Sequence, residues 1–331
     1  MITRRRIIVA LGAGAFAAPL AALAQQPAKV RRIGFLAVRS RPSAANPDAG
    51  YAAFIKEMGA LGWVEGKNLL IEWRYAEGDY ARLAKLAAEL VQIGVEVIVT
   101  HSTPGTQAAR QATSTIPIVT AGAADPVGSG FAATLARPGG NVTGLSNMGI
   151  DMSPKQLEML KIMMPRLATV AFLLNPGTAP NLLMLESLQA AAGKFRVKIL
   201  RFDASTPQQV EAGFATMKAQ RAEAVIVAND AFFIGQRQRL AELGVKHRLP
   251  TLSSYREHVA VGGLMSYGEN QSDIWKQAAV YVDKILKGAK PGELPFEQPA
   301  KLQLTINRKT AKALGLAIPQ ELVLRADEVI E

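Results

Sequence analysis

Residues 95–121, VEVIVTHSTPGTQAARQATSTIPIVTA, hold two runs of β-forming residues separated by a segment of helical length. The runs 95–100 and 116–121 are rich in valine, isoleucine and threonine, which are typical of strands. The turn residues HSTPG at 101–105 follow the first run, and a helix is expected to begin near Thr106. Strand, helix and strand in this order predict a parallel α/β sheet with helices on its faces.

The same alternation extends over the rest of the chain. Ten strands are predicted, at 33–38, 69–75, 95–100, 116–121, 142–145, 169–174, 197–202, 224–228, 250–253 and 263–267. Helices are expected between nearly all of them, among them 80–93, 155–164, 207–220 and 235–247. The strands divide into five and five at a break near 144–150, which predicts an α/β protein of two doubly wound, flavodoxin-like lobes with parallel sheets. Two such lobes facing each other would form a ligand cleft at the carboxyl ends of their strands.

The C-terminal part predicts that the chain passes between the lobes more than once. Residues 270–287 are expected to form one long amphipathic helix. Its apolar stripe consists of Ile274, Ala278, Tyr281, Val282 and Ile285. The turn-rich segment GAKPGELP at 288–295 follows, and then a strand at 302–306 and a short helix near 309–314. The long helix therefore stands between two possible crossing points, 267–268 and 291–295.

The N-terminus has the composition of a secretory signal peptide. Arginines at positions 4–6 precede an uncharged apolar run at 7–23, and the sequence ALA at 22–24 is a cleavage site of the A-x-A kind. We therefore assign residues 1–24 to the signal and expect cleavage after Ala24 and a periplasmic location. The pattern TRRRII at 3–8 resembles a twin-arginine signal, which leaves the export route open.

Part of this segment also matches a dinucleotide-binding fingerprint. Residues 12–17 read GAGAFA, which fits G-x-G-x-x-A after an apolar run. That motif needs a stable helix and an acidic residue about 20 positions later. Pro19 interrupts the helix, and no aspartate or glutamate occurs before Asp48. The fingerprint is therefore attributed to the signal peptide, and no cofactor is expected.

The composition of the 331 residues excludes several kinds of site. There is no cysteine, so disulfides, thiolate metal sites and a thiol nucleophile are excluded. The formal net charge is +11, but the basic residues are spread along the chain and no nucleic-acid-reading motif accompanies them, so nucleic acid is not an expected partner. The motifs H-E-x-x-H and G-x-S-x-G are absent as well. We expect a monomer that is not an enzyme, with no catalytic residues and no metal site.

Six segments resemble the solute-binding proteins of ABC importers. They are LGWVEGKN (61–68), ATSTIPIV (112–119), DPVGSG (125–130), ARPGGNVTG (136–144), GGLMSYG (262–268) and KTAKALGL (309–316). Together they cover essentially the whole chain after the signal and resemble the branch of tryptophan- and tyrosine-binding components. The resemblance implies the type I periplasmic-binding-protein fold. It also implies capture of a small solute, an amino acid or related carboxylate, for delivery to a membrane permease and its ATPase.

The family pattern further implies where the lobes begin and end. Residues 29–145 with 268–291 would form the N-terminal lobe, and residues 146–267 with 292–331 the C-terminal lobe, joined by a three-crossover hinge. The family usually carries a smaller residue at the position of His101, a departure that bears on solute specificity and makes His101 a candidate site residue.

Candidate binding residues in the N-terminal lobe follow its predicted strands. Ser102 and Thr103 could cap the next helix, and the free amide groups at its N-terminus suit a solute carboxylate. Arg39, in a loop with Ser40 after the first strand, is a second candidate carboxylate partner. Asp125 could hold its glycine-rich turn or meet a solute ammonium group.

The C-terminal lobe supplies candidates at the corresponding positions. Asn175 and Asn229 offer both hydrogen-bond donors and acceptors. Asp230 could pair with an amine or cap the following helix, and Tyr255 and Tyr267 could form an aromatic wall. Two other interpretations stay open from sequence alone. One is a periplasmic sensor that presents the solute to a receptor, and the other is an α/β hydrolase or oxidoreductase on a similar frame.

Overall fold

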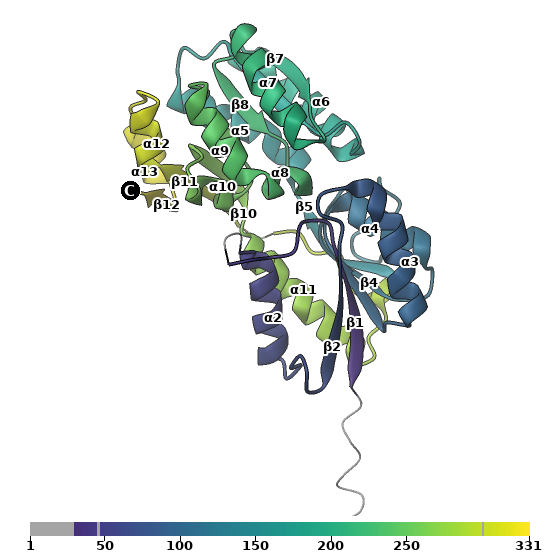
Figure 1. Ribbon diagram of the computed structural model, residues 1–331. Coiled ribbons are helices and arrows are strands. Elements are labelled where there is room, and N and C mark those ends of the chain that lie inside the picture. The colour runs from purple at the N-terminus through teal and green to yellow at the C-terminus, as the bar shows by residue number, and fades with distance from the viewer. Residues whose placement is uncertain (1–29, 45–46, 300) are drawn as a thin grey trace, which may run out of the picture.

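The computed structural model describes residues 30–44, 47–299 and 301–331, so the proposed signal peptide lies outside the described residues. Two β-sheets, each flanked by helices, form two lobes that lie end to end (Figure 1). We call the lobe of β1 to β5 the first lobe and the lobe of β6 to β12 the second lobe. Both are of the expected doubly wound α/β type, which confirms the predicted fold class.

The first sheet has five parallel strands in the order β2-β1-β3-β4-β5. Its strands are β1 (Arg31–Ala37), β2 (Leu69–Tyr75), β3 (Val97–Thr100), β4 (Ile118–Ala124) and β5 (Val142–Asn147). This is the flavodoxin-like order, in which crossover helices cover both faces. All five strands overlap the predicted ones, with ends that differ by up to three residues.

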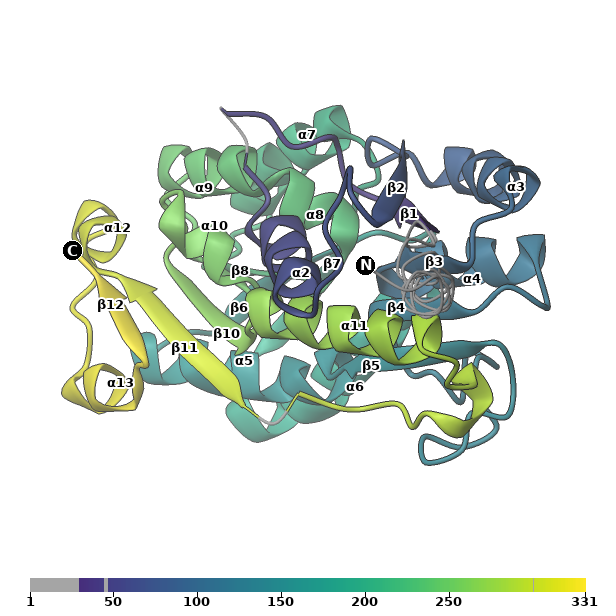
Figure 2. The same ribbon diagram turned by 90° about the horizontal axis from the view of Figure 1, so that it is seen from below.

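The second sheet has seven strands in the order β12-β11-β10-β9-β8-β6-β7. Its strands are β6 (Thr169–Leu174), β7 (Lys198–Asp203), β8 (Ala224–Val227), β9 (Thr251–Ser253), β10 (Met265–Glu269), β11 (Leu302–Asn307) and β12 (Glu328–Ile330). The prediction of five strands for this lobe was therefore too low. The strand-like C-terminal segment becomes β11, which pairs antiparallel with β10 and is extended by β12 at the sheet edge (Figure 2).

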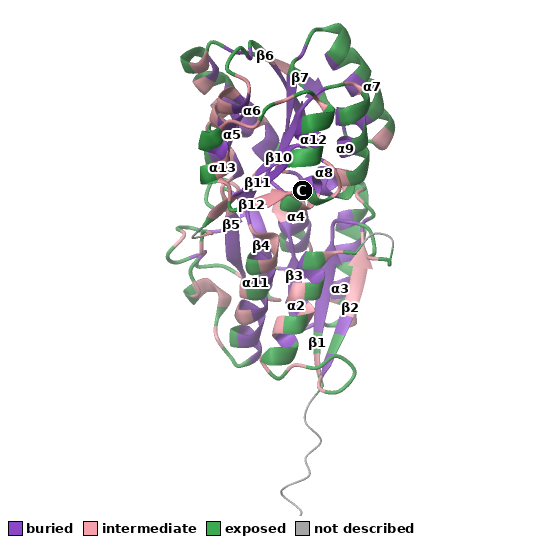
Figure 3. Cartoon of the chain, turned by 90° about the vertical axis from the view of Figure 1, so that its left-hand side faces the viewer, coloured by how far each residue is buried: buried purple, intermediate pink, exposed green. Residues whose placement is uncertain are grey.

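Helices cover both faces of each sheet, and their outer surfaces are exposed, while the central strands are buried and the edge strands β2, β7 and β12 are partly exposed (Figure 3). The first lobe contains α2 (Ala49–Ala60), the 3₁₀ helix η2 (Tyr80–Arg82), α3 (Leu83–Ile93), α4 (Ser102–Ala112), α11 (Gln271–Leu286) and the 3₁₀ helix η3 (Pro291–Glu293). The second lobe contains α5 (Gly149–Met163), α6 (Ala179–Phe195), α7 (Pro207–Ala219), α8 (Ala231–Gly235), α9 (Arg237–Lys246), α10 (Arg256–Ala260), α12 (Arg308–Ala313) and α13 (Gln320–Arg325).

Two helices begin earlier than predicted, and each contains a proline. Helix α4 starts at Ser102 rather than near Thr106, since Pro104 lies in the first turn, where its missing N–H leaves no intrahelical bond unmade. Helix α5 starts at Gly149 rather than at 155 and accommodates Pro154 in its interior.

Helix α11 belongs to the first lobe although the chain enters it from the second. Every residue of its predicted apolar stripe is buried, together with Trp275, against the first sheet and α2. The indole of Trp275 stacks on Phe35 at a ring-centroid distance of 5.2 Å. Gly50 of α2 permits this close packing, because a Cβ atom there would lie 2.3 Å from the indole.

The chain crosses between the lobes three times. The first two crossings lie between β5 and α5 and between β10 and α11. The third comes after Glu297 rather than at 291–295, since Ser146 N–H still donates to Glu297 O at 2.9 Å and Phe296 is buried in the first lobe. The turn-rich segment therefore packs against the first lobe, and the crossing follows it. Within the described residues no helix is long and apolar enough to cross a membrane.

Candidate functional site

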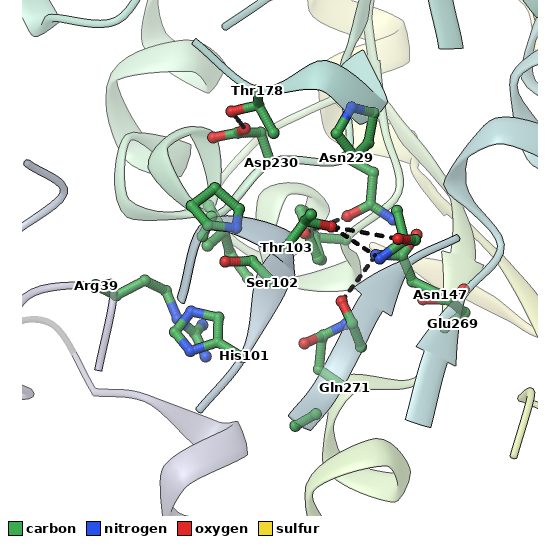
Figure 4. Close-up of a pocket in the computed structure, with 18 residues that line it drawn as sticks. Arg39, His101, Ser102, Thr103, Asn147, Thr178, Asn229, Asp230, Glu269 and Gln271 are labelled. Carbon is green, nitrogen blue, oxygen red and sulfur yellow. Dashed lines mark hydrogen bonds between the residues drawn. The ribbon is translucent and has the colours of Figure 1, made fainter. Parts of the chain in front are cut away.

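A narrow cavity lies between the two lobes, at the carboxyl ends of their strands. Its volume is about 30 Å³, on the order of two water molecules. Its wall comes from the loop after β1, the N-terminus of α4, the ends of β5 and β10, and the loops before α6, α8 and α10. Figure 4 shows Arg39 and His101 on one side of this cavity and Asn147 and Glu269 on the other.

Arg39 is buried and only partly paired. One guanidinium nitrogen, Nη1, lies 2.9 Å from the carboxylate of Asp48, which also accepts the Tyr51 N–H at the start of α2. The guanidinium stands 4.8 Å above the ring centre of Tyr51. Its Nε and Nη2 atoms are buried and have no hydrogen-bond partner. Two aligned donors of a permanent cation are thus left for an anion at the cavity wall.

His101 precedes α4 and is buried beside the aromatic core of the first lobe. Its ring lies edge-on to Trp275, with centroids 5.6 Å apart, and neither ring nitrogen has a partner. Burial, reinforced by the charge of Arg39, holds the pKa of His101 well below its ordinary value. The neutral imidazole therefore offers one donor and one acceptor to the cavity.

Ser102 and Thr103 do not cap α4 as expected. The cap position is occupied by His101, whose side chain makes no cap hydrogen bond. Thr103 Oγ1 instead accepts the Ala124 N–H at 3.1 Å and so ties α4 to the end of β4. Ser102 Oγ is buried without a partner and lines the cavity beside the free amide groups of the helix N-terminus.

Asp230 is the most heavily hydrogen-bonded side chain of the second lobe's cavity wall. Its carboxylate accepts the Phe232 N–H at 2.9 Å, which makes it the N-cap of α8. It also accepts hydrogen bonds from Thr178 Oγ1 and Asn181 Nδ2, each at 3.0 Å, and from Tyr80 OH at 2.5 Å. Burial raises the pKa of Asp230, and these four donors oppose the rise.

Tyr255 and Asn229 form a hydrogen-bonded pair in the same wall. The Tyr255 hydroxyl donates to Asn229 Oδ1, and both residues line the cavity. Asn229 Nδ2 is buried and without a partner, so this amide keeps a donor for a solute.

Glu269 is a cavity residue that the sequence reasoning missed. It ends β10, is 4% exposed, and accepts the Met148 N–H at 2.5 Å through Oε1. Burial raises the pKa of Glu269 to about 7, against the opposing hydrogen bond from Met148. Asn147 and Gln271 were missed as well. The rule of residues at strand ends points to Asn147 and Glu269 too, but the predicted strands ended at 145 and 267, two residues before them.

The structure brings seven of the predicted site residues together and leaves four outside. The seven in the cavity wall are Arg39, His101, Ser102, Thr103, Asn229, Asp230 and Tyr255.

The other four have different surroundings. Ser40 is exposed, and Asp125 holds its own turn by accepting the Gly128 N–H at 2.9 Å. Asn175 likewise accepts a local N–H, from Gly177 at 3.1 Å, and Tyr267 packs on the core of the second lobe.

The lobes touch each other directly beside the cavity. The Tyr80 hydroxyl of the first lobe donates to Asp230 of the second and accepts the Phe232 N–H at 3.1 Å. A second interlobe hydrogen bond runs from Arg237 Nη2 to Pro47 O at 3.2 Å. These contacts hold the cleft in a closed arrangement.

Comparison with known proteins places this geometry in a family. Residues 36–330 match the ABC transporter substrate binding protein family. A tyrosine-binding protein of Clostridioides difficile (strain R20291) is 26% identical over 289 residues, which are 87% of this chain and 82% of that protein. The structure of an ABC domain in complex with L-Trp from Streptococcus pneumonia is 26% identical, with a TM-score of 0.82 over 91% of this chain and 99% of that one.

A second solved structure of a substrate-binding protein is less similar in shape. The ligand-free, open structure of a substrate-binding protein with adhesive properties from Clostridium difficile is 25% identical and also covers 91% of this chain and 99% of its own. Its TM-score is only 0.63. Its identity and coverage nearly equal those of the L-Trp complex, while its structural similarity to this chain is lower. The fold is that of type I periplasmic binding proteins. With a family match over residues 36–330, this protein belongs to the ABC transporter substrate-binding proteins.

Proposed function

We propose that this protein is the extracytoplasmic binding component of an ABC importer and that it captures an amino acid in the interlobe cavity. The observation that carries the proposal is a set of buried polar atoms without partners, all on residues that line one cavity. These atoms are Arg39 Nε and Nη2, both ring nitrogens of His101, Ser102 Oγ and Asn229 Nδ2. Unpaired buried polar atoms are costly and rare, so a polar ligand that pairs with them accounts for their presence.

The first-lobe side of the cavity suits a carboxylate. Arg39 presents two free donors, Ser102 Oγ a third, and α4 directs the positive end of its dipole toward the same place. Asp48 holds the guanidinium in position without using Nε or Nη2. A solute carboxylate would thus meet a fork of donors that is already oriented.

The side chain of the solute is proposed to be aromatic. The names of two relatives, a tyrosine-binding protein and a domain in complex with L-Trp, support this choice. Tyr255 and His101 supply flat surfaces in the cavity wall, and His101 and Asn229 could pair with a phenol or an indole N–H. The cavity is too narrow for such a solute as it stands, so the lobes must separate for entry and close again around it.

Delivery requires export and a membrane partner. We propose that the signal at 1–24 is cleaved after Ala24, that the protein acts in the periplasm, and that its closed form docks on a permease with an associated ATPase. Gln25 at the N-terminus of protein purified from the periplasmic fraction would support the export step. An uncleaved chain confined to the cytoplasm would contradict it.

A thermal-shift screen of the mature protein tests the ligand class. L-tryptophan and L-tyrosine are expected to raise the melting temperature, and a ligand at 100 times its Kd adds about 2.7 kcal/mol of stability. Sugars and polyols serve as controls that lack a carboxylate. The amino acid assignment fails if all amino acids leave the melting temperature unchanged while a solute without a carboxylate raises it.

A further inference from the structure

An amino acid brings an ammonium group into the cavity together with its carboxylate. Two acidic side chains line the described cavity wall, Asp230 and Glu269. We propose that Glu269, and not Asp230, accepts the ammonium group of the solute and so selects amino acids over acids that lack the amine. The inference rests on the proposed function, in which Arg39 and Ser102 take the carboxylate.

Asp230 has little capacity left for a solute. Its two oxygens accept hydrogen bonds from Tyr80, Thr178, Asn181 and the backbone of Phe232, about the number that a carboxylate can accept. These donors come from both lobes and from the start of α8. Asp230 therefore joins the closed lobes to each other, and an ammonium group could reach it only by displacing one of these donors.

Glu269, in contrast to Asp230, has most of its hydrogen-bond acceptor capacity unused. In the described part of the chain its side chain has one hydrogen bond, from Met148 N–H to Oε1, so Oε2 keeps its full acceptor capacity. The residue lies across the cavity from Arg39 (Figure 4). An amino acid between them would place its carboxylate on the guanidinium and its ammonium group on Glu269.

The electrostatic surroundings of Glu269 favour a cationic ligand. The titratable side chains that share the cavity wall are Arg39, His101, Asp230 and Tyr255, besides Glu269 itself. Of these only Arg39 carries a positive charge, and Asp48 already pairs with it. A buried carboxylate without a cation is destabilised by desolvation, and an ammonium group within hydrogen-bond distance would offset that cost.

The test compares amino acids with their deaminated analogues by isothermal titration calorimetry. The ligands are L-tryptophan and L-tyrosine, with indole-3-propionate and 3-(4-hydroxyphenyl)propionate as the amine-free partners. The wild-type protein is expected to bind each amino acid at least tenfold more tightly than its analogue. Glu269→Gln keeps an oxygen for the Met148 N–H and removes the charge. It is expected to weaken amino acid binding roughly tenfold to hundredfold and to change analogue binding less than threefold.

Other outcomes separate the inference from the proposed function. Equal weakening of both ligand classes by Glu269→Gln would mean that the residue acts only through Met148, and unchanged binding would mean that it does not meet the amine. Either result overturns the inference, and so does loss of the amine preference in Asp230→Asn. If the analogues bind to the wild-type protein as tightly as the amino acids do, Glu269 does not select for the amine. That result does not affect the proposed carboxylate site at Arg39 and Ser102. A panel in which no carboxylate binds overturns the proposed function first.

Discussion

The hydroxyl of Tyr80 offers a direct way to change closure without touching the solute. It joins η2 of the first lobe to Asp230 and Phe232 of the second, beside the cavity rather than in its wall. When the lobes separate this contact is lost and water hydrates the phenol. Tyr80→Phe removes only the oxygen atom, so we expect it to destabilise the closed form relative to the open form.

The size of the effect follows from the partners of the hydroxyl. A hydrogen bond to a charged group contributes roughly 1.5–3 kcal/mol to stability. Asp230 keeps its bonds from Thr178, Asn181 and the Phe232 N–H in the variant, so the lower half of that range applies. Because every 1.4 kcal/mol is a factor of ten in an equilibrium constant, Kd should rise roughly tenfold to fortyfold.

Calorimetric titration with L-tryptophan and L-tyrosine measures this change in Kd. Thermal unfolding of the ligand-free protein shows whether the variant also lowers the stability of the fold. Tyr267→Phe is the matched control, since it removes a hydroxyl from a tyrosine outside the cavity wall. The reasoning is refuted if Kd stays within twofold of the wild-type value. It is also refuted if Tyr80→Phe lowers the melting temperature of the ligand-free protein with no change in Kd, because the contact would then persist in both forms.

Three further predictions concern the carboxylate site, Glu269 and the first-lobe core. Arg39→Lys should weaken binding of amino acids and deaminated acids alike by roughly tenfold to hundredfold in calorimetry, since a lysine retains the charge but not the fork of donors, and a loss confined to one ligand class would contradict this. The pKa of about 7 for Glu269 lies above its ordinary value, so the ligand-free folded protein binds a proton more tightly than the unfolded chain. Its stability should therefore fall as pH rises from 4.5 through 7, by up to about 3 kcal/mol, and Glu269→Gln should flatten this decline in melting curves recorded from pH 5 to 8; an unchanged slope would show that the carboxylate is not desolvated. Gly50→Ala should destabilise the protein by about 1–3 kcal/mol in urea unfolding, because its Cβ would lie 2.3 Å from the Trp275 indole, whereas Gly59→Ala, on the same helix with open space at its Cβ, should not.

The alternation of strands and helices was sufficient to predict both lobes. Buried parallel strands appear as continuous apolar runs, so their number and order along the chain were readable. The edge strand β12 was harder, because it spans only Glu328–Ile330 and its residues are half-buried. Short edge strands depend on the partner strand that they join, which is a tertiary property and leaves little trace in a local pattern.

The candidate site was predicted in part for the same reason. Strand ends that open onto the cleft identified His101, Ser102, Asn229 and Asp230, because parallel strands place their carboxyl ends at one edge. The rule could not tell which side chain is already satisfied. Asp230 meets donors from two other segments, η2 of the first lobe and the start of α6, and only the folded chain brings these together.

The position of α11 also determines the order in which the lobes can be completed. The strands of the first sheet end at Asn147, yet one face of that sheet is covered only by α2 until Trp275 and its neighbours on α11 are available. By then the ribosome has already made β6 to β10 of the second lobe. The first lobe therefore cannot complete its folding before most of the second lobe is synthesised. A fragment that ends at residue 148 would contain all five strands of the first sheet but not α11, the last helix of its core. The first lobe is thus synthesised first but completes its core only after most of the second lobe has been made.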